Sequence, residues 1–139
     1  MQVLDLTKEY PRSPKDSMCG LVHIPRMIDK ARAFREHKLG EYIFPCPLDK
    51  LVLNFMRVDE IEFADKAYAL SETAFAEWLE DTLKIKSAAE KEFINRQILG
   101  RKPDNEDRLK YFVDIRNRID PSRTDIITWV GLLDLEEGH

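Results

Sequence analysis

The chain has 139 residues, of which 43% are hydrophobic and 35% are charged, and its net charge is −4. Enough apolar residues are present to build a hydrophobic core, so the composition excludes a largely disordered chain. The acidic balance and the lack of a long basic stripe argue against nucleic-acid binding, because Lys and Arg contacts to phosphate dominate that affinity. We therefore expect a single domain over residues 1–139, with no nucleic-acid partner.

The first residues, MQVLDLTKEYPRSPKD, contain acids and prolines where an export signal has a basic start and an apolar run. No later stretch approaches the roughly 18 consecutive apolar residues of a membrane span, so we expect no membrane partner. The two cysteines, Cys19 and Cys46, do not form a C-x-x-C pair. We expect both to be free thiols in a cytoplasmic protein.

Residues 1–23 carry repeated turn signals, including Tyr10-Pro11 and Ser13-Pro14. A residue that precedes proline is driven away from the helical region. This segment should therefore be an extended, proline-rich arm packed on the rest of the domain.

Hydrophobic residues then recur every three or four positions, which predicts helices. The first helix should start at Pro25 and hold His37 and Lys38 in its last turn, before Gly40. The later helices should start at or just after Pro47, Asp59, Ser71, Ser87, Asp104 and either Thr124 or Asp125. We predict an all-α fold, a compact bundle of about six to seven short helices with the extended N-terminal arm.

Some positions within these helices can be assigned more closely. Ser87 and Glu90 have the spacing of a capping box, in which each side chain bonds the backbone of the other. Near the C-terminus, we expect an inward-facing apolar row followed by a tryptophan in the core. These residues are Leu109, Phe112, Ile115, Ile119 and Trp129.

Basic residues gather around the predicted start of the first helix, although the chain is acidic overall. Residues 1–40 contain eight Lys or Arg against five Asp or Glu, whereas residues 41–139 contain fourteen against twenty-one. A helix N-terminus presents unpaired N–H groups and the positive end of the helix dipole. We expect a small anionic ligand, such as a phosphate or carboxylate, to bind there. The candidate ligand-binding residues are Arg12, His23, Arg26 and Lys30, with Lys15 close by.

An alternative reading of the same residues requires no ligand. The basic side chains could pair with Asp16, Asp29 and Glu36 and so hold the arm against the bundle. Ion pairs of this kind are common and individually weak.

Cys46 lies between two prolines, and if Pro47 begins a helix, Cys46 occupies the capping position. The helix dipole would favour its thiolate, which would make Cys46 a nucleophile. The candidate catalytic residues are Cys46, Asp49 and His23, although the sequence does not show whether His23 lies near the cysteine. The alternative is that Cys46 is a small buried residue in a rigid turn.

Common catalytic and nucleotide-binding signatures, such as G-x-G-x-x-G and H-E-x-x-H, are absent from the sequence. The three histidines, His23, His37 and His139, are widely spread, so we expect no metal site and no cofactor.

Five segments of the chain, LTKEYPRSPKD, GLVHIPRMIDKARA, LGEY, PCPLD and RTDIITWVGLLDLEEG, occur in an order and spacing similar to those of a known family. In these segments the chain resembles the bacterial family called domain of unknown function 5069. The resemblance spans nearly the whole chain and implies a stand-alone bacterial domain. It implies no activity, cofactor or catalytic residue.

These observations lead to two functional hypotheses, and neither decides whether the protein is an enzyme. The first is a cytoplasmic small-molecule binding protein or enzyme, with its site where the arm meets the first two helices. The second is a non-catalytic interaction module, for example a homodimer formed through an apolar helix face. A concave polar pocket would favour the first, and an exposed apolar patch would favour the second.

Overall fold

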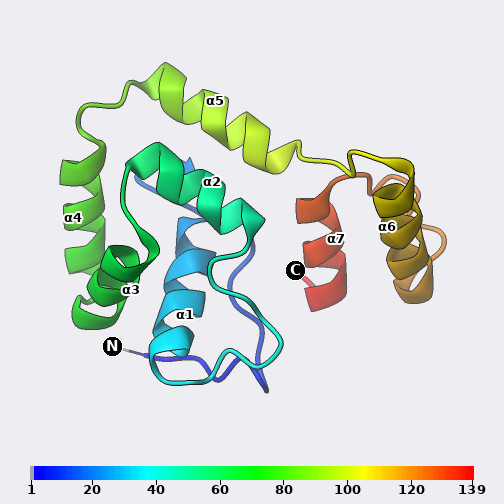
Figure 1. Ribbon diagram of the computed structural model, residues 1–139, viewed down its shortest axis with the longest axis horizontal. Coiled ribbons are helices and arrows are strands. Elements are labelled where there is room, and N and C mark those ends of the chain that lie inside the picture. The colour runs from blue at the N-terminus through cyan, green and yellow to red at the C-terminus, as the bar shows by residue number, and fades with distance from the viewer. Residues whose placement is uncertain (1) are drawn as a thin grey trace.

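The structure is a computed structural model that describes residues 2–139. Its regular elements are seven helices and one short hairpin, which confirms the all-α prediction (Figure 1). The strands are β1 (Ser17–Met18) and β2 (Leu21–Val22). The helices are α1 (Ile24–Arg35), α2 (Pro47–Met56), α3 (Glu60–Ala69), α4 (Glu72–Leu83), α5 (Ala88–Leu99), α6 (Glu106–Ile119) and α7 (Trp129–Glu137).

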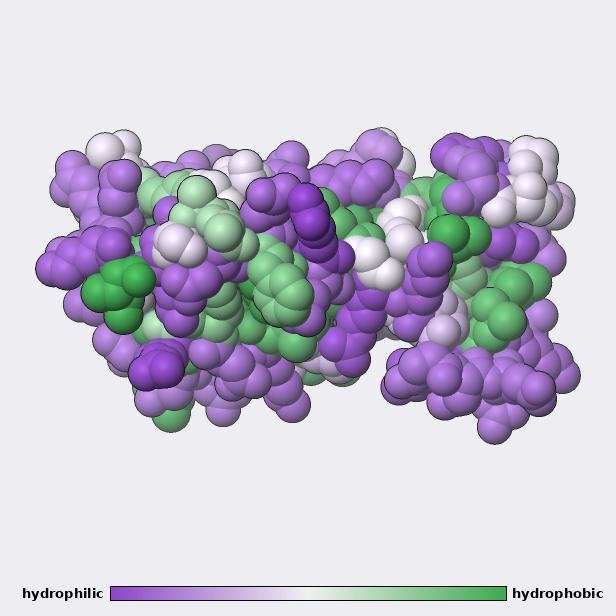
Figure 2. All heavy atoms as spheres, turned by 90° about the horizontal axis from the view of Figure 1, so that it is seen from above, coloured by the Kyte–Doolittle hydropathy of each residue, from purple (hydrophilic) through white to green (hydrophobic). Residues whose placement is uncertain are grey.

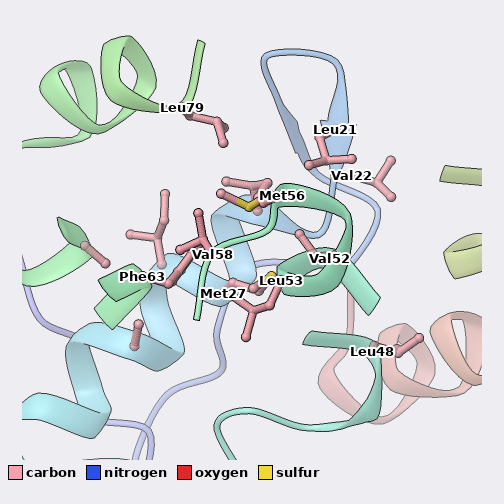
Figure 3. Close-up of a cluster of buried hydrophobic side chains, with 14 of the residues drawn as sticks. Leu21, Val22, Met27, Leu48, Val52, Leu53, Met56, Val58, Phe63 and Leu79 are labelled. Atoms are coloured by element: carbon pink, nitrogen blue, oxygen red, sulfur yellow. The ribbon is translucent and has the colours of Figure 1, made fainter. Parts of the chain in front are cut away.

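The main hydrophobic core is built around α1, which lies in the middle of the molecule with α3 and α4 to one side (Figure 1). Met27 of α1 is fully buried, and so are Val52 of α2 and Phe63 of α3. Figure 3 shows side chains from the hairpin, α1, α2, α3 and α4 pointing into this one cluster. The arm therefore contributes to the core through β2, because Leu21 and Val22 belong to the cluster.

Helix α6 forms the far end of the molecule, with α7 between it and the main body (Figure 1). A second, smaller cluster of buried hydrophobic residues joins these two helices: Phe112, Ile126 and Leu132. The Phe112 and Trp129 rings pack edge to face with their centroids 5.1 Å apart. None of the helices in the described part of the chain is both long and apolar enough to cross a membrane.

Three of the predicted helix starts, Asp59, Ser71 and Ser87, are confirmed by side-chain caps. Asp59 and Ser71 accept hydrogen bonds from the backbone N–H three residues later, at the starts of α3 and α4. Ser87 and Glu90 form the full capping box of α5, with both bonds at 3.0 Å. Cys46 is the residue before α2, as expected from Pro47.

The predicted end of the first helix is wrong. Helix α1 ends at Arg35, and His37 and Lys38 lie beyond it. The His37 backbone is left-handed, with φ 56°, and the Lys38 N–H donates to the Ala33 carbonyl oxygen at 2.8 Å. This is the Schellman arrangement, which closes a helix within the turn after its last residue.

The arm is also less extended than predicted, because residues 17–22 form the hairpin. Ser17 pairs with Val22, and Met18 pairs with Leu21. The turn residues between the strands, Cys19 and Gly20, both have positive φ, as a tight two-residue hairpin loop requires.

The last two helices start later than predicted. The cap of α6 is Asn105 rather than Asp104, and the cap of α7 is Thr128 rather than Thr124 or Asp125. Two residues expected to face inward from α6 are also exposed: Leu109 by 52% and Ile119 by 41%. The main neighbour of α6 among the described helices is α7, so a narrower stripe is buried than the apolar pattern of α6 suggests.

Candidate functional site

A buried polar cluster occupies the junction of the arm, α1 and α2. We call it the junction cluster, and it consists of His23, Lys30, Cys46 and Asp49. The Asp49 carboxylate is its centre: Oδ1 bonds His23 Nε2 at 2.6 Å, and Oδ2 accepts from Lys30 Nζ at 2.7 Å. His23, Lys30 and Asp49 are all buried, whereas Cys46 is partly exposed. The sequence-predicted catalytic candidates are therefore brought together.

Local structure places two members of the cluster on the first turn of α2. Pro47 begins the helix, which leaves Cys46 as the residue before it, and Asp49 is the third helical residue. The Asp49 Oδ2 atom accepts a hydrogen bond from the Cys46 backbone N–H at 2.9 Å. This bond satisfies a backbone donor at the helix start and points the carboxylate back toward Cys46.

His23 is placed by the junction of the hairpin and α1. It precedes α1 with a left-handed backbone, φ 78° and ψ −18°. Its N–H donates to the Asp16 carbonyl oxygen at 2.8 Å, and its own carbonyl accepts from Met27. Such a conformation is unfavourable for a residue with a Cβ atom and persists only where the surroundings fix it. The imidazole is therefore held rigidly against Asp49.

The protonation states in the cluster follow from burial and hydrogen bonding. Burial by itself raises the pKa of Asp49, but the His23 hydrogen bond and the Lys30 charge outweigh it and lower this pKa well below its ordinary value. Burial lowers the pKa of His23, against the opposing effect of Asp49. At neutral pH the cluster thus contains a carboxylate and a neutral imidazole.

The neutral imidazole has one defined tautomer. An ionised carboxylate can only accept hydrogen bonds, so the proton must be on Nε2, which donates to Asp49. His23 Nδ1 then carries a lone pair, and it is buried without a hydrogen-bond partner among residues 2–139. An oriented imidazole with an unoccupied acceptor nitrogen is the arrangement of a general base.

The Cys46 thiol lies near the His23 imidazole. One ring nitrogen of His23, the Cys46 sulfur and one oxygen of Asp49 all lie within 4.8 Å of one another. The helix dipole was expected to lower the pKa of the Cys46 thiol, but this pKa is raised. Burial and the Asp49 charge raise the pKa of Cys46 despite the opposing charge of Lys30. Any reaction at Cys46 therefore needs a base, and His23 is adjacent.

Nitrogen, sulfur and oxygen donors from these three residues are also ligand types for zinc. Lys30 argues against that use, because its ammonium already bonds the same carboxylate. A metal ion bound to Asp49 would lie next to this positive charge, which would repel it. The expectation that the chain has no metal site remains a prediction.

The four predicted anion-binding residues do not converge on one point. His23 and Lys30 share Asp49, whereas Arg12 bonds Asp29 through Nε and Nη2, both at 3.0 Å. Internal pairing, the alternative reading of these residues, is therefore observed in the structure. Of the three acids suggested as partners, however, only Asp29 forms an ion pair with one of the four residues. Anion binding by them remains a prediction that requires a ligand to compete with carboxylates of the chain.

Arg26 is the most completely paired of the predicted residues. Its guanidinium donates to both carboxylate oxygens of Glu137 at 2.7 and 2.8 Å, and both side chains are almost fully buried. Lys15, by contrast, is exposed and lies 3.4 Å from Asp134. The sequence analysis missed Glu137 because nothing distinguishes it from the other acids of an ordinary helix end.

The comparisons with known proteins agree with the resemblance seen in the sequence. The sequence pattern of the family described as "Domain of unknown function (DUF5069)" matches residues 8–139. No curated protein matches the chain.

Proposed function

Because the chain belongs to the family of domain of unknown function 5069, whose description names no activity, we propose a function from the geometry of the junction cluster. The proposal is a small-molecule enzyme of the bacterial cytoplasm, with Cys46 as nucleophile and His23 as its base. The Cys46 thiol passes its proton to the His23 imidazole, and the sulfur attacks an acyl carbonyl carbon to form a thioester. The bond from that carbon to the leaving group breaks as the imidazolium returns the proton to the leaving group. Asp49 stabilises the imidazolium that forms, and Lys30 favours the thiolate by its charge.

The observation that supports this role most directly is the unpartnered, buried Nδ1 of His23. Buried polar atoms nearly always have a hydrogen-bond partner, because an unsatisfied one costs about 1–3 kcal/mol. A purely structural His–Asp pair would not need a buried acceptor nitrogen without a partner. The partial exposure of Cys46 supplies the route by which a substrate would reach the cluster.

The proposal is tested with 4-nitrophenyl acetate, an activated ester that releases a coloured leaving group. The expected result is a rapid burst of one equivalent of nitrophenolate per chain and an acetyl group on Cys46, found by mass spectrometry. Cys46→Ser should abolish the burst, and His23→Gln should slow it by roughly 100-fold or more.

The second cysteine provides a matched control, because Cys19 is also partly exposed but does not belong to the junction cluster. Its thiol donates to the Ala76 carbonyl oxygen at 3.5 Å. Cys19→Ser should leave the burst unchanged. Circular dichroism checks that each variant is folded. Acetylation of Cys19 instead of Cys46, or a full burst rate in folded His23→Gln, would contradict the proposed role.

The second part of the proposal is an anionic group on the ligand. Arg12 keeps 35% of its side chain exposed and, together with Arg32, lines a cavity of about 510 Å³ beside Ser71. The Arg32 guanidinium donates to the carbonyl oxygens of Ala67 and Leu70, and it has no carboxylate partner among residues 2–139. A phosphate or carboxylate in this cavity would supply one.

Melting in the presence of phosphate tests this part separately. Phosphate at low ionic strength should raise the melting temperature of the wild type but not of Arg12→Ala. Arg123→Ala is the control, because Arg123 forms an exposed pair with Asp125 and does not line this cavity. An equal response to phosphate in all three proteins would exclude a specific anion site at Arg12.

The alternative of an interaction module is supported by a different observation. Helix α6 carries three exposed apolar or aromatic side chains, Leu109, Tyr111 and Ile119, which are between 41% and 60% exposed. Figure 2 shows hydrophobic side chains among hydrophilic ones at this end of the molecule. A homodimer formed through α6 would sediment as a dimer that Leu109→Glu dissociates.

A further inference from the structure

A cleft lies where the arm, the connector between α1 and α2, and the last two helices meet. Its volume is about 720 Å³, within the range of roughly 300–1,000 Å³ typical of ligand pockets. Tyr10 comes from the arm, Glu41 and Tyr42 from the connector, Tyr111 from α6, and Glu136 and Glu137 from α7. The junction-cluster residues do not line this cleft, so it is separate from the proposed thiol site.

All the charged residues that line the cleft are negative. Three of the lining residues are glutamates, and neither lysine nor arginine lines the cleft. Arg26 lies behind the wall and neutralises Glu137 alone. Glu41 and Glu136 have no ion-pair partner among the residues that the structure describes. Partial burial and the neighbouring Glu137 carboxylate raise the pKa of Glu136, against the opposing charge of Arg26.

Aromatic faces form the rest of the lining. Tyr10 is 56% exposed and Tyr111 is 60% exposed, so both rings are accessible from the cleft side of the molecule. The Tyr42 hydroxyl donates to Glu137 Oε2 at 2.9 Å, which fixes that ring in place. Tyrosine faces and carboxylates together attract organic cations, because the π-face and the carboxylate are both negative.

The wall of the cleft already contains one such pairing. The Arg26 guanidinium carbon lies 5.6 Å from the centre of the Tyr42 ring while its nitrogens bond Glu137. A cation is thus held between a tyrosine face and a glutamate within the protein itself. Tyr10, Tyr111, Glu41 and Glu136 offer the same groups with no cation of the chain bound to them.

We propose that this cleft binds an organic cation, an ammonium or guanidinium group carried on an apolar body. The cationic group lies against Glu136 and Glu41 and is covered by the Tyr10 and Tyr111 rings. The apolar body contacts Leu6 and Leu133, which also line the cleft. The tyrosine faces and leucines favour an organic cation over a bare metal ion, because only an organic cation can use them.

A matched pair of probes tests the proposal by calorimetry and by NMR of the tyrosine rings. Butylguanidinium should bind and shift the Tyr10 and Tyr111 signals, whereas butylurea, which has nearly the same shape without the charge, should not. Glu136→Gln should weaken butylguanidinium binding roughly tenfold, because the negative charge that strengthens the hydrogen bond to the cation is lost. Glu136 is exposed, so this change should not disturb the fold.

Glu77→Gln is the control, since Glu77 is an exposed glutamate on α4, outside the cleft. It should bind butylguanidinium as the wild type does. Equal binding of butylurea, unchanged affinity in Glu136→Gln, or no binding of butylguanidinium at millimolar concentration would each overturn the proposal.

A second titration distinguishes two sources of the cation, a small free molecule and a basic segment of another protein. A short capped peptide with one arginine between leucines is titrated beside butylguanidinium. Binding at least tenfold tighter for the peptide identifies a basic segment of a protein as the source. Equal or weaker binding of the peptide identifies a small free cation.

Discussion

Arg26 and Glu137 join α1 to α7 through a two-point ion pair, although they are 111 residues apart in the sequence. The exposed fractions of their side chains are 2% and 3%, so water cannot replace either partner. The Tyr42 hydroxyl bonds the same carboxylate and fills a further acceptor position. Burial and its hydrogen bond to Glu137 raise the pKa of Tyr42, which keeps the hydroxyl protonated as a donor. This group of three residues fastens the C-terminal helix to the core.

The first prediction concerns this ion pair. Arg26→Ala should lower the free energy of unfolding by about 3–5 kcal/mol, because Glu137 is left buried without its cation. Urea denaturation measures the loss, which should be the same with and without added phosphate. The double variant Arg26→Met with Glu137→Met should be more stable than Arg26→Ala. Stabilisation by phosphate that disappears in Arg26→Ala would instead make Arg26 part of an anion site.

The second prediction is a pH dependence caused by His23. Its pKa is lowered in the folded protein, so below the ordinary histidine pKa of about 6.5 the unfolded chain binds more protons than the folded one. The free energy of unfolding should therefore decrease as the pH falls from 7 toward 5, by at most about 1.4 kcal/mol per pH unit from this residue. The Asp49 contribution is lost only at lower pH, because its lowered pKa keeps it ionised below the ordinary aspartate value.

Urea denaturation between pH 5 and 7 tests the assignment to His23. His23→Gln should flatten the slope, whereas His37→Gln, at an exposed histidine, should leave it as in the wild type. A slope that is unchanged in His23→Gln would show that another group causes the dependence.

The third prediction concerns the capping box of α5. Ser87→Ala should cost about 1 kcal/mol, because the Glu90 N–H loses its side-chain acceptor at the start of a helix. Ser122→Ala is a suitable control, since the Ser122 hydroxyl bonds Asp120 in a turn outside any helix. Equal losses in the two variants would show that the effect is not specific to the cap.

The fourth prediction concerns the small cluster between α6 and α7. Phe112 is 1% exposed, so Phe112→Ala should cost about 3–5 kcal/mol through lost burial and a cavity. Phe93 is 64% exposed, and Phe93→Ala should change the stability by less than about 0.5 kcal/mol. Hydrogen exchange of the α6 amides should increase in the first variant only. Similar losses in both variants would place Phe112 outside a packed core.

Short-range signals in the sequence account for much of the fold. The caps at Asp59, Ser71 and Ser87 act within three residues, so each can be recognised without the rest of the chain. Prediction failed where several neighbouring residues could each cap a helix, as Thr124, Asp125 and Thr128 could before α7. The α7 helix begins at Trp129, whose N–H donates to the carbonyl oxygen of Arg101, and no local pattern announces that bond.

In the candidate site too, some features were predictable from the sequence and others were not. The sequence by itself determined that Cys46 precedes a helix and that Asp49 lies in its first turn, because Pro47 is suited to a helix start. Only the tertiary structure decided that His23 and Lys30 converge on Asp49 and that Arg26 takes Glu137. Carboxylates look alike in a sequence, and which of them meets a given cation depends on how helices pack. That packing is set by burial of apolar surface across the whole chain, which acts between residues far apart.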